Sequence, residues 1–146
     1  MTKTTEFDIA RYILNKLGIM SAMKLQKLLY YSQAWSMVWD EEELFDTDFQ
    51  AWANGPVLPS IYDQHRGMFK VGEDNFIKGD ADKVIDDAAD TVDKVLEAYG
   101  SKTAQWLSNL THEEAPWLDA RNGLPTSARS NHTITKGDIH LFYSGL

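Results

Sequence analysis

The spacing of apolar residues predicts an amphipathic helix near the N-terminus. Four apolar residues recur at the three- and four-residue intervals that place side chains on one face of a helix: Ile9, Tyr12, Ile13 and Leu17. Thr5 followed three residues later by Asp8 has the pattern of a capping box, and Gly18 suits the end of a helix. We therefore predict a helix between Thr5 and Gly18.

The next segment, residues 22–39, is apolar on almost every side. Ser21 is a favourable N-cap for it, and its charged residues, Lys24 and Lys27, lie on one edge near its N-terminal end. A helix that is apolar all round has no face to give to water. We expect this helix to be central, with the other elements packed around it.

The middle of the chain has weaker patterns. Residues 40–43 form an acidic loop, residues 49–52 favour a short strand, and residues 54–56 form a turn. A proline at the start and a glycine after the end favour a short helix over residues 59–66. Residues 68–79 suit a loop or a small hairpin.

Residues 80–99 predict a further amphipathic helix, because apolar residues again repeat at three and four. The opposite face carries an acidic stripe: Asp82, Asp86, Asp90, Asp93 and Glu97. More helices are expected with Ser101 as N-cap, from Pro116 onward, and, after a polar loop, with Thr135 as N-cap.

The predicted fold class is mainly α. We expect a single compact helical domain over residues 1–146, with about six helices and at most a minor short β element. The 146 residues contain no cysteine, which excludes a disulfide framework, a thiol nucleophile and a cysteine-ligated metal. No apolar run reaches the roughly 20 residues of a membrane span, and the N-terminus lacks a signal-peptide core. We expect a cytoplasmic protein without a membrane partner.

The net charge of −8 is unevenly distributed along the chain. Residues 1–39 carry +3, residues 40–100 carry −11, and residues 101–146 are neutral. An acidic surface repels phosphate, so no direct nucleic-acid partner is expected. A basic protein partner is compatible with it, and a merely solvated acidic surface remains the plainer alternative.

The usual catalytic motifs are absent from the sequence. His112-Glu113 begins like a zinc-protease motif, but Pro116 stands where the second histidine is needed. His132 and His140 have no ligand spacing, and the sequence contains no nucleophile elbow, phosphate-binding loop or dinucleotide motif. We expect no catalytic residue, metal or cofactor and no enzymatic activity. A metal-dependent hydrolase that draws its acids from separate elements stays open as a weaker alternative.

The chain is rich in tryptophan, with five residues on four segments: Trp35, Trp39, Trp52, Trp106 and Trp117. Large aromatic residues usually belong to the core, but tryptophan is also prominent at protein interfaces. The tryptophans outside the long helices, together with part of the acidic stripe, are the candidate partner-binding residues: Trp52, Asp86, Asp90, Asp93 and Trp117.

Four blocks carry a more specific pattern: Met23-Lys24-Leu25-Gln26-Lys27-Leu28-Leu29-Tyr30-Tyr31-Ser32-Gln33-Ala34-Trp35; Leu44-Phe45-Asp46 with Phe49-Gln50-Ala51-Trp52 and Gly55-Pro56-Val57; Leu110-Thr111-His112-Glu113-Glu114 with Pro116-Trp117; and Ile134-Thr135-Lys136 with Asp138-Ile139. In this order they resemble the Panacea domain, whose members are also described as SocA-like antitoxins and GepA-type phage-associated proteins. An asparagine, Asn54, precedes Gly55-Pro56 where the family usually has a larger residue.

The resemblance implies an antitoxin that neutralises a cognate protein toxin by direct binding. An alternative within the family is a proteolytic adaptor that delivers its toxin to an energy-dependent protease, which would add a protease chaperone to the partners. The chain begins almost at the first matching block, so we expect no separate DNA-binding domain. The resemblance transfers no catalytic residue.

Overall fold

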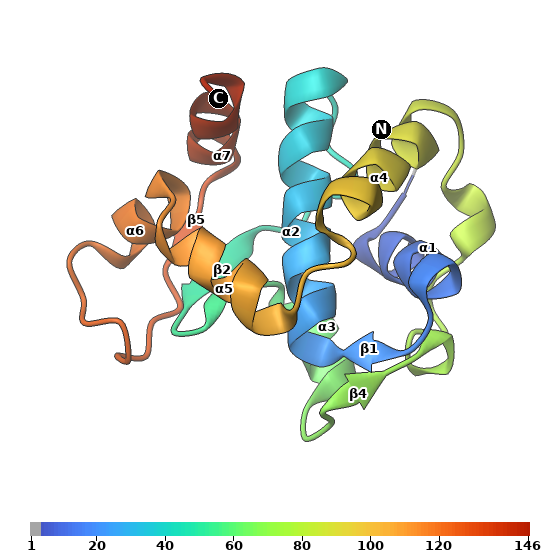
Figure 1. Cartoon of the computed structure of the whole chain (residues 1–146), viewed down its shortest axis with the longest axis horizontal. Helices are drawn as coiled ribbons and strands as arrows, with labels where there is room; N and C mark the ends of the chain where they lie inside the picture. Colours follow the sequence, from blue (N-terminus) through green and yellow to red (C-terminus); the bar gives the residue numbers. More distant parts are fainter. Residues whose placement is uncertain (1–3) are drawn as a thin grey trace.

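The computed structural model describes residues 4–146 and is built around one helix (Figure 1). The described residues form seven α-helices: α1 (Glu6–Leu17), α2 (Ala22–Trp39), α3 (Pro59–His65), α4 (Asp86–Tyr99), α5 (Ala104–His112), α6 (Ala115–Arg121) and α7 (Lys136–Ser144). The mainly α class is confirmed. None of the helices in this part of the chain is long and apolar enough to cross a membrane.

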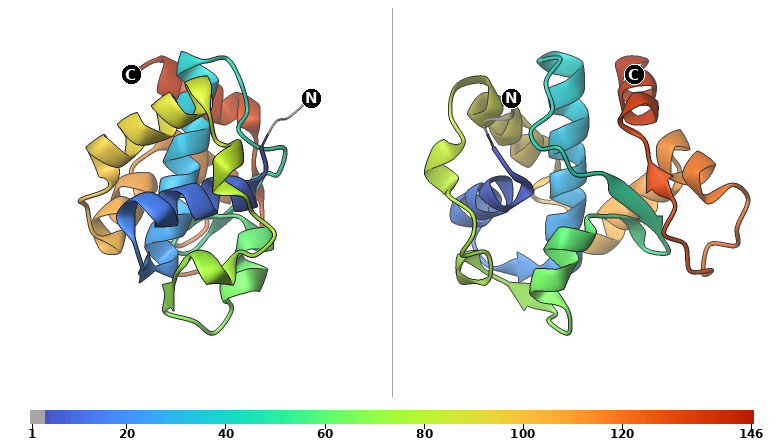
Figure 2. Two further views of the ribbon diagram at one scale, coloured as in Figure 1. Left: turned by 90° about the vertical axis from the view of Figure 1, so that its right-hand side faces the viewer. Right: turned by 180° about the vertical axis from the view of Figure 1, so that it is seen from behind.

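Helix α2 is central, as its apolar pattern predicts. Helices α1, α4, α5 and α7 and strand β3 all contact it, and Figure 2 shows it enclosed from several directions. Leu25, Leu28 and Leu29 are completely buried. The core therefore forms around α2, and the shorter elements cover its different faces.

Five short strands form two antiparallel sheets, which is more β structure than the sequence predicts. Strand β1 (Met20–Ser21) pairs with β4 (Lys70–Val71), and β2 (Phe49–Trp52) lies between β3 (Gly55–Val57) and β5 (Thr133–Ile134). The strand at residues 49–52 is confirmed. The segment from 68 to 79 is not a hairpin of its own, because its strand pairs with β1 instead.

Local hydrogen bonds explain most helix ends. The Thr5 and Asp8 capping box is present, and the side chains of Ser21 and Thr135 cap α2 and α7. Ser101 is not the N-cap of α5. Thr103 occupies that position, and its hydroxyl accepts from the backbone N–H of Trp106.

The prediction of one continuous helix over residues 80–99 is wrong. Two short 3-10 helices, η1 (Glu73–Asn75) and η2 (Ala81–Lys83), precede α4, which begins only at Asp86. The Asp80 side chain accepts from the backbone N–H of Asp82, and its own N–H donates to Asp8 of α1. The Asp80 side-chain bond competes locally with helix formation, and the long-range bond to Asp8 holds the Asp80 backbone against α1, so Asp82 lies outside α4.

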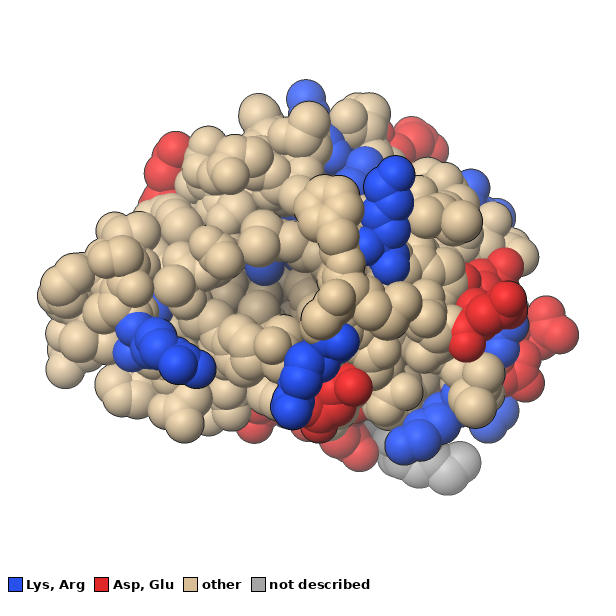
Figure 3. Space-filling view, turned by 90° about the horizontal axis from the view of Figure 1, so that it is seen from below, with Lys and Arg blue, Asp and Glu red and all other residues tan. Residues whose placement is uncertain are grey.

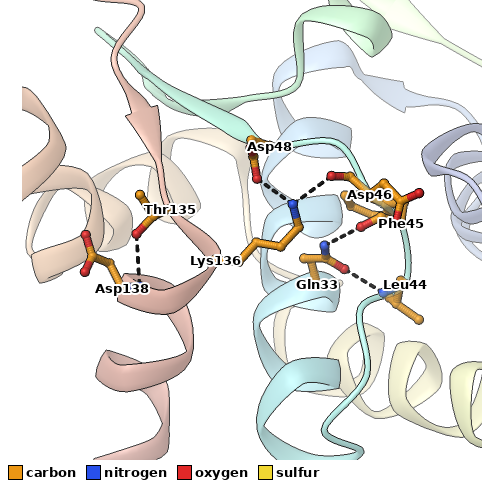
Figure 4. A network of polar contacts seen from close by, with 8 residues as sticks. All are labelled: Gln33, Leu44, Phe45, Asp46, Asp48, Thr135, Lys136 and Asp138. Atoms are coloured by element: carbon orange, nitrogen blue, oxygen red, sulfur yellow. Dashed lines mark hydrogen bonds and ion pairs between the residues drawn. The ribbon is translucent and has the colours of Figure 1, made fainter. Parts of the chain in front are cut away.

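Polar side chains of α2 hold the loop that follows it (Figure 4). The Gln33 amide donates to the carbonyl of Phe45 at 2.9 Å and accepts from the N–H of Leu44 at 2.8 Å. Lys136, in the first turn of α7, donates to the carbonyl of Asp46 and pairs with Asp48. The loop is thus tied to both α2 and α7.

Candidate functional site

A cavity of about 990 Å³ opens on one face of the molecule. Its wall comes from the N-terminal ends of α2 and α5, the β2–β3 hairpin, α3, the segment before β4 and residues 129–131. Figure 3 shows this face from below, hollowed, with Lys or Arg atoms inside and around the hollow and most acidic residues toward the outline. Its aromatic and apolar wall includes Trp52, Tyr62, Met68 and Phe69.

Lys27 lines the cavity and is completely buried. Its ammonium group donates to the carbonyl of Pro56 at 3.1 Å. Burial lowers the pKa of Lys27 to about 7, because a charged amine is costly away from water. Gly55, with a φ of +118°, leaves room for the lysine: a Cβ there would lie 2.5 Å from Lys27 Cε.

Gln26 fixes the wall beside Lys27. Its amide accepts from the N–H of Leu58 at 2.9 Å, donates to the carbonyl of Leu58 at 3.2 Å, and lies 3.1 Å from Nε2 of His65. Burial, together with the charge of Lys27, lowers the pKa of His65. A neutral His65 that accepts from the Gln26 amide satisfies all three contacts, which assigns its ring proton to Nδ1.

The two candidate tryptophans have different surroundings. Trp52 is half-buried, lines the cavity and packs edge-to-face on Tyr62 with ring centroids 5.0 Å apart. Trp117 lies in α6, is only 3% exposed, and stacks on His112 at 4.1 Å. Its indole N–H donates to the carbonyl of Trp52 at 2.8 Å. Trp117 therefore belongs to the support of β2, and its ring is not at the surface.

Arg121 places the loop that completes the cavity wall. This completely enclosed guanidinium, 2% exposed, donates to four carbonyl groups, those of Ala51, Pro125, Thr126 and Ala128. It also lies over the ring of Trp117 at 4.8 Å. Because these bonds tie the loop to β2, Arg129 and Asn131 reach the cavity. The sequence offered no indication of this role.

The three candidate aspartates on α4 lie outside the cavity wall. Asp86 and Asp90 are exposed, and Asp86 has a positive φ of 54° at the first position of the helix. Asp93 accepts from the hydroxyl of Tyr12 at 2.8 Å and lies 3.9 Å from Lys16. Burial and the Asp93 contact raise the pKa of Tyr12 to about 12. Asp93 thus joins α4 to α1, while Asp86 and Asp90 face solvent.

A second polar cluster joins helices that are far apart in the sequence. One carboxylate oxygen of Glu114 accepts from the hydroxyls of Tyr31 and Tyr143, both at 2.7 Å, and the hydroxyls of Tyr30 and Tyr143 lie 3.1 Å apart. Burial raises the pKa of Glu114, and the two hydroxyl bonds oppose that shift. The cluster holds the start of α6 against α2 and α7.

The remaining histidines form individual contacts. Nε2 of His140 lies 3.0 Å from a carboxylate oxygen of Glu41, and Nδ1 of His132 lies 2.9 Å from the carbonyl of Ala120. Within residues 4–146, no three His, Asp or Glu side chains are grouped so that they could hold a metal ion.

Residues 25–118 match the family model described as antitoxin SocA-like, Panacea domain. The chain belongs to this family. No curated protein and no solved structure matches the chain. The matched part of the Panacea domain runs from Leu25 in α2 to Leu118 in α6, and it includes Lys27, Trp52 and His65 of the cavity wall.

The structure explains why the sequence blocks of this Panacea domain occur together. Lys27 and Gln26 of the first block bind the backbone at Pro56 and Leu58, in and just after the second block. Trp117 of the third block donates to the carbonyl of Trp52 in the second. Tyr31 of the first block donates to Glu114 of the third. The first three blocks are thus in mutual contact, and residues of the first and second blocks line the cavity.

Proposed function

We propose that this protein is an antitoxin that neutralises a cognate toxin by direct protein–protein binding. Membership of the SocA-like Panacea family, which carries an antitoxin-type role, is the observation on which the proposal rests. The open, partly apolar cavity supports it, since interfaces often combine a concave surface with exposed aromatic side chains. We further propose that the chain acts as one domain and without contacting nucleic acid.

Two surfaces are proposed to contact the toxin. The first is the cavity, which presents Trp52. The second is the exposed pair Asp86 and Asp90 on α4, which suits a basic patch on the toxin. Trp117 and Asp93 are left out because the first is buried and the second is engaged by Tyr12.

Co-expression tests the proposal. The open reading frames that flank the gene are each induced alone and together with this protein, and cell growth is measured. We expect one of them to arrest growth alone and to be harmless in the presence of the antitoxin, and the purified proteins to form a complex. If no neighbouring product is both toxic and neutralised, the proposed function fails.

The half-life of the toxin separates neutralisation by binding from delivery to a protease. A binding antitoxin leaves the half-life unchanged in a pulse-chase experiment, whereas an adaptor shortens it. Rescue that disappears in cells lacking the energy-dependent protease would replace our proposal with the adaptor alternative.

The acidic pair is tested by the double substitution Asp86→Lys and Asp90→Lys. We expect the affinity for the toxin to fall by about tenfold at low salt and by less at high salt, because exposed charges are screened. Asp119→Lys with Asp138→Lys, two exposed acids on α6 and α7, is the matched control. Equal affinities for both double variants would remove Asp86 and Asp90 from the interface.

A further inference from the structure

The cavity has a positive lining in a protein with a net charge of −8. Lys27 and Arg129 are the basic side chains of the wall, His65 beside them is neutral, and none of the described residues that line it is Asp or Glu. The N-terminal ends of α2 and α5 also reach it, through Ser21 to Met23 and through Ala104 and Gln105. Helix N-termini carry partial positive charge, so both add to the positive potential.

Lys27 is the centre of this potential. An ammonium group has three hydrogen-bond donors, and the structure gives Lys27 one acceptor, the carbonyl of Pro56. Within residues 4–146 the amine forms no ion pair. A buried cation without a counter-charge is unfavourable, and a carboxylate that enters the cavity would supply both the charge and the missing acceptor. Because Lys27 is 0% exposed, this contact requires the wall atoms that cover the amine to move aside when the segment binds.

The rim of the cavity is apolar and exposed. Phe69 is 76% exposed and Met68 is 39% exposed, and both line the cavity beside the aromatic wall formed by Trp52 and Tyr62. A small molecule held inside the cavity would leave the Phe69 ring largely in water. A protein segment that crosses the rim would cover Phe69 and Met68, which favours a macromolecular occupant.

We propose that the cavity receives a segment of the toxin that places a carboxylate against Lys27 and packs apolar side chains on Trp52 and Phe69. This inference rests on the proposed antitoxin function and names the chemistry of the partner: an acidic residue flanked by apolar ones. The cavity lining is positive and the pair Asp86 and Asp90 on α4 is negative. The toxin is therefore proposed to present an acidic segment to the cavity and a basic patch to α4.

The first test uses full-length variants and the toxin identified by co-expression. Lys27→Met removes the amine and keeps a side chain of similar length, and Phe69→Ala trims an exposed ring that the fold does not need. We expect each to weaken toxin binding by at least about tenfold in calorimetry. The controls are Lys78→Met and Ile77→Ala, an exposed lysine and an 80% exposed isoleucine outside both proposed surfaces, which stay within about twofold of wild type.

The second test does not depend on the toxin. The capped pentapeptide Ala-Phe-Glu-Leu-Ala is titrated into ¹⁵N-labelled protein, alongside the same peptide with glutamine in place of glutamate. We expect the glutamate peptide to shift the Trp52 indole resonance and to bind at least about tenfold more tightly than the glutamine peptide, with the difference lost in Lys27→Met. Equal affinities, or no shift up to about 5 mM of either peptide, would overturn the carboxylate site.

The outcomes separate the two proposals. If wild type neutralises the toxin and both Lys27→Met and Phe69→Ala bind it as well as wild type does, the cavity proposal is overturned and the antitoxin function stands. If wild type neutralises no neighbouring product, the function fails and the peptide titration decides the cavity chemistry. If free N-acetyl-phenylalanine binds as tightly as the glutamate peptide, the site is a small-acid pocket and the toxin segment is wrong.

Discussion

Replacing Lys27 with methionine is expected to stabilise the protein at neutral pH, although it removes a native hydrogen bond. Burial lowers the pKa of Lys27 from its ordinary 10.5 to about 7. Folding at pH 7 therefore either strips a proton from the amine or buries the charge, and both are unfavourable. Methionine fills a similar volume without charge.

The magnitude follows from the pKa difference. At about 1.4 kcal/mol for each pKa unit, the shift from 10.5 to about 7 corresponds to roughly 5 kcal/mol of lost stability. Methionine leaves the Pro56 carbonyl without the Lys27 donor, which costs about 1–3 kcal/mol. The net gain is about 2–4 kcal/mol, or roughly 5–15 °C in Tm for a chain of this size.

The gain depends on pH in a defined direction. Below about pH 7 the amine is protonated in both the folded and the unfolded state, so the full penalty of burying it is present. Between about pH 7 and 10.5 only the unfolded state keeps the proton, so the penalty declines as pH rises. Above 10.5 it has vanished. His65 and His112 face Lys27, but their pKa values lie below the ordinary 6.5 and outside this window.

Urea unfolding of wild type and Lys27→Met at several pH values measures the difference directly. We expect the variant to be more stable at pH 6–7, and less stable above about pH 10, where only the unpaired Pro56 carbonyl remains. The titration of buried tyrosines affects both proteins and cancels in the difference. A variant that is less stable than wild type at pH 7, or a difference that does not change with pH, would refute the reasoning.

Three further substitutions test the buried polar contacts of Arg121 and Glu114. Arg121→Lys removes most of the bonds to the four carbonyls, so we expect a loss of about 2–4 kcal/mol and faster amide exchange over residues 122–132 by mass spectrometry; unchanged exchange would show that the loop is held otherwise. Glu114→Ala leaves the hydroxyls of Tyr31 and Tyr143 without their acceptor, so we expect a loss of about 2–4 kcal/mol in chemical denaturation. Glu114→Gln keeps an acceptor oxygen and should lose less than half as much, and equal losses would contradict the assignment.

The parts of the fold that the sequence predicts are those decided by local chemistry. Helix α2 is apolar all round, and a helix of this kind is stable only when the other elements bury it. The caps at Thr5, Ser21 and Thr135 are local, because each side-chain hydroxyl accepts from a backbone N–H only three residues later. The start of α4 was misplaced because Asp80 bonds to Asp8, which is 72 residues away.

The candidate site depends on contacts between segments that are far apart in the sequence. The local spacing of apolar and polar residues contains little information about such contacts. The sequence places Trp117 in a short helix outside the long ones, which favours an exposed ring, yet Trp117 stacks on His112 and lies buried in α6. Lys27 resembled an edge residue of α2, because nothing nearby shows that Gly55 and Pro56 pack over it. Two-residue strands such as β1 and β5 are too short to leave a periodic pattern.

The way α2 holds its neighbouring segments has a consequence for how such a protein can change. Gln26, Gln33 and Ser36 hydrogen-bond only to main-chain groups of the segments they tie, apart from the contact between Gln26 and His65. A main-chain carbonyl is present whatever side chain the residue carries, and a main-chain N–H is present in every residue except proline. Substitutions in these segments can therefore alter the surface offered to a partner without loosening the helix that supports it. The exposed side chains of these segments can therefore vary while their main-chain bonds to α2 persist.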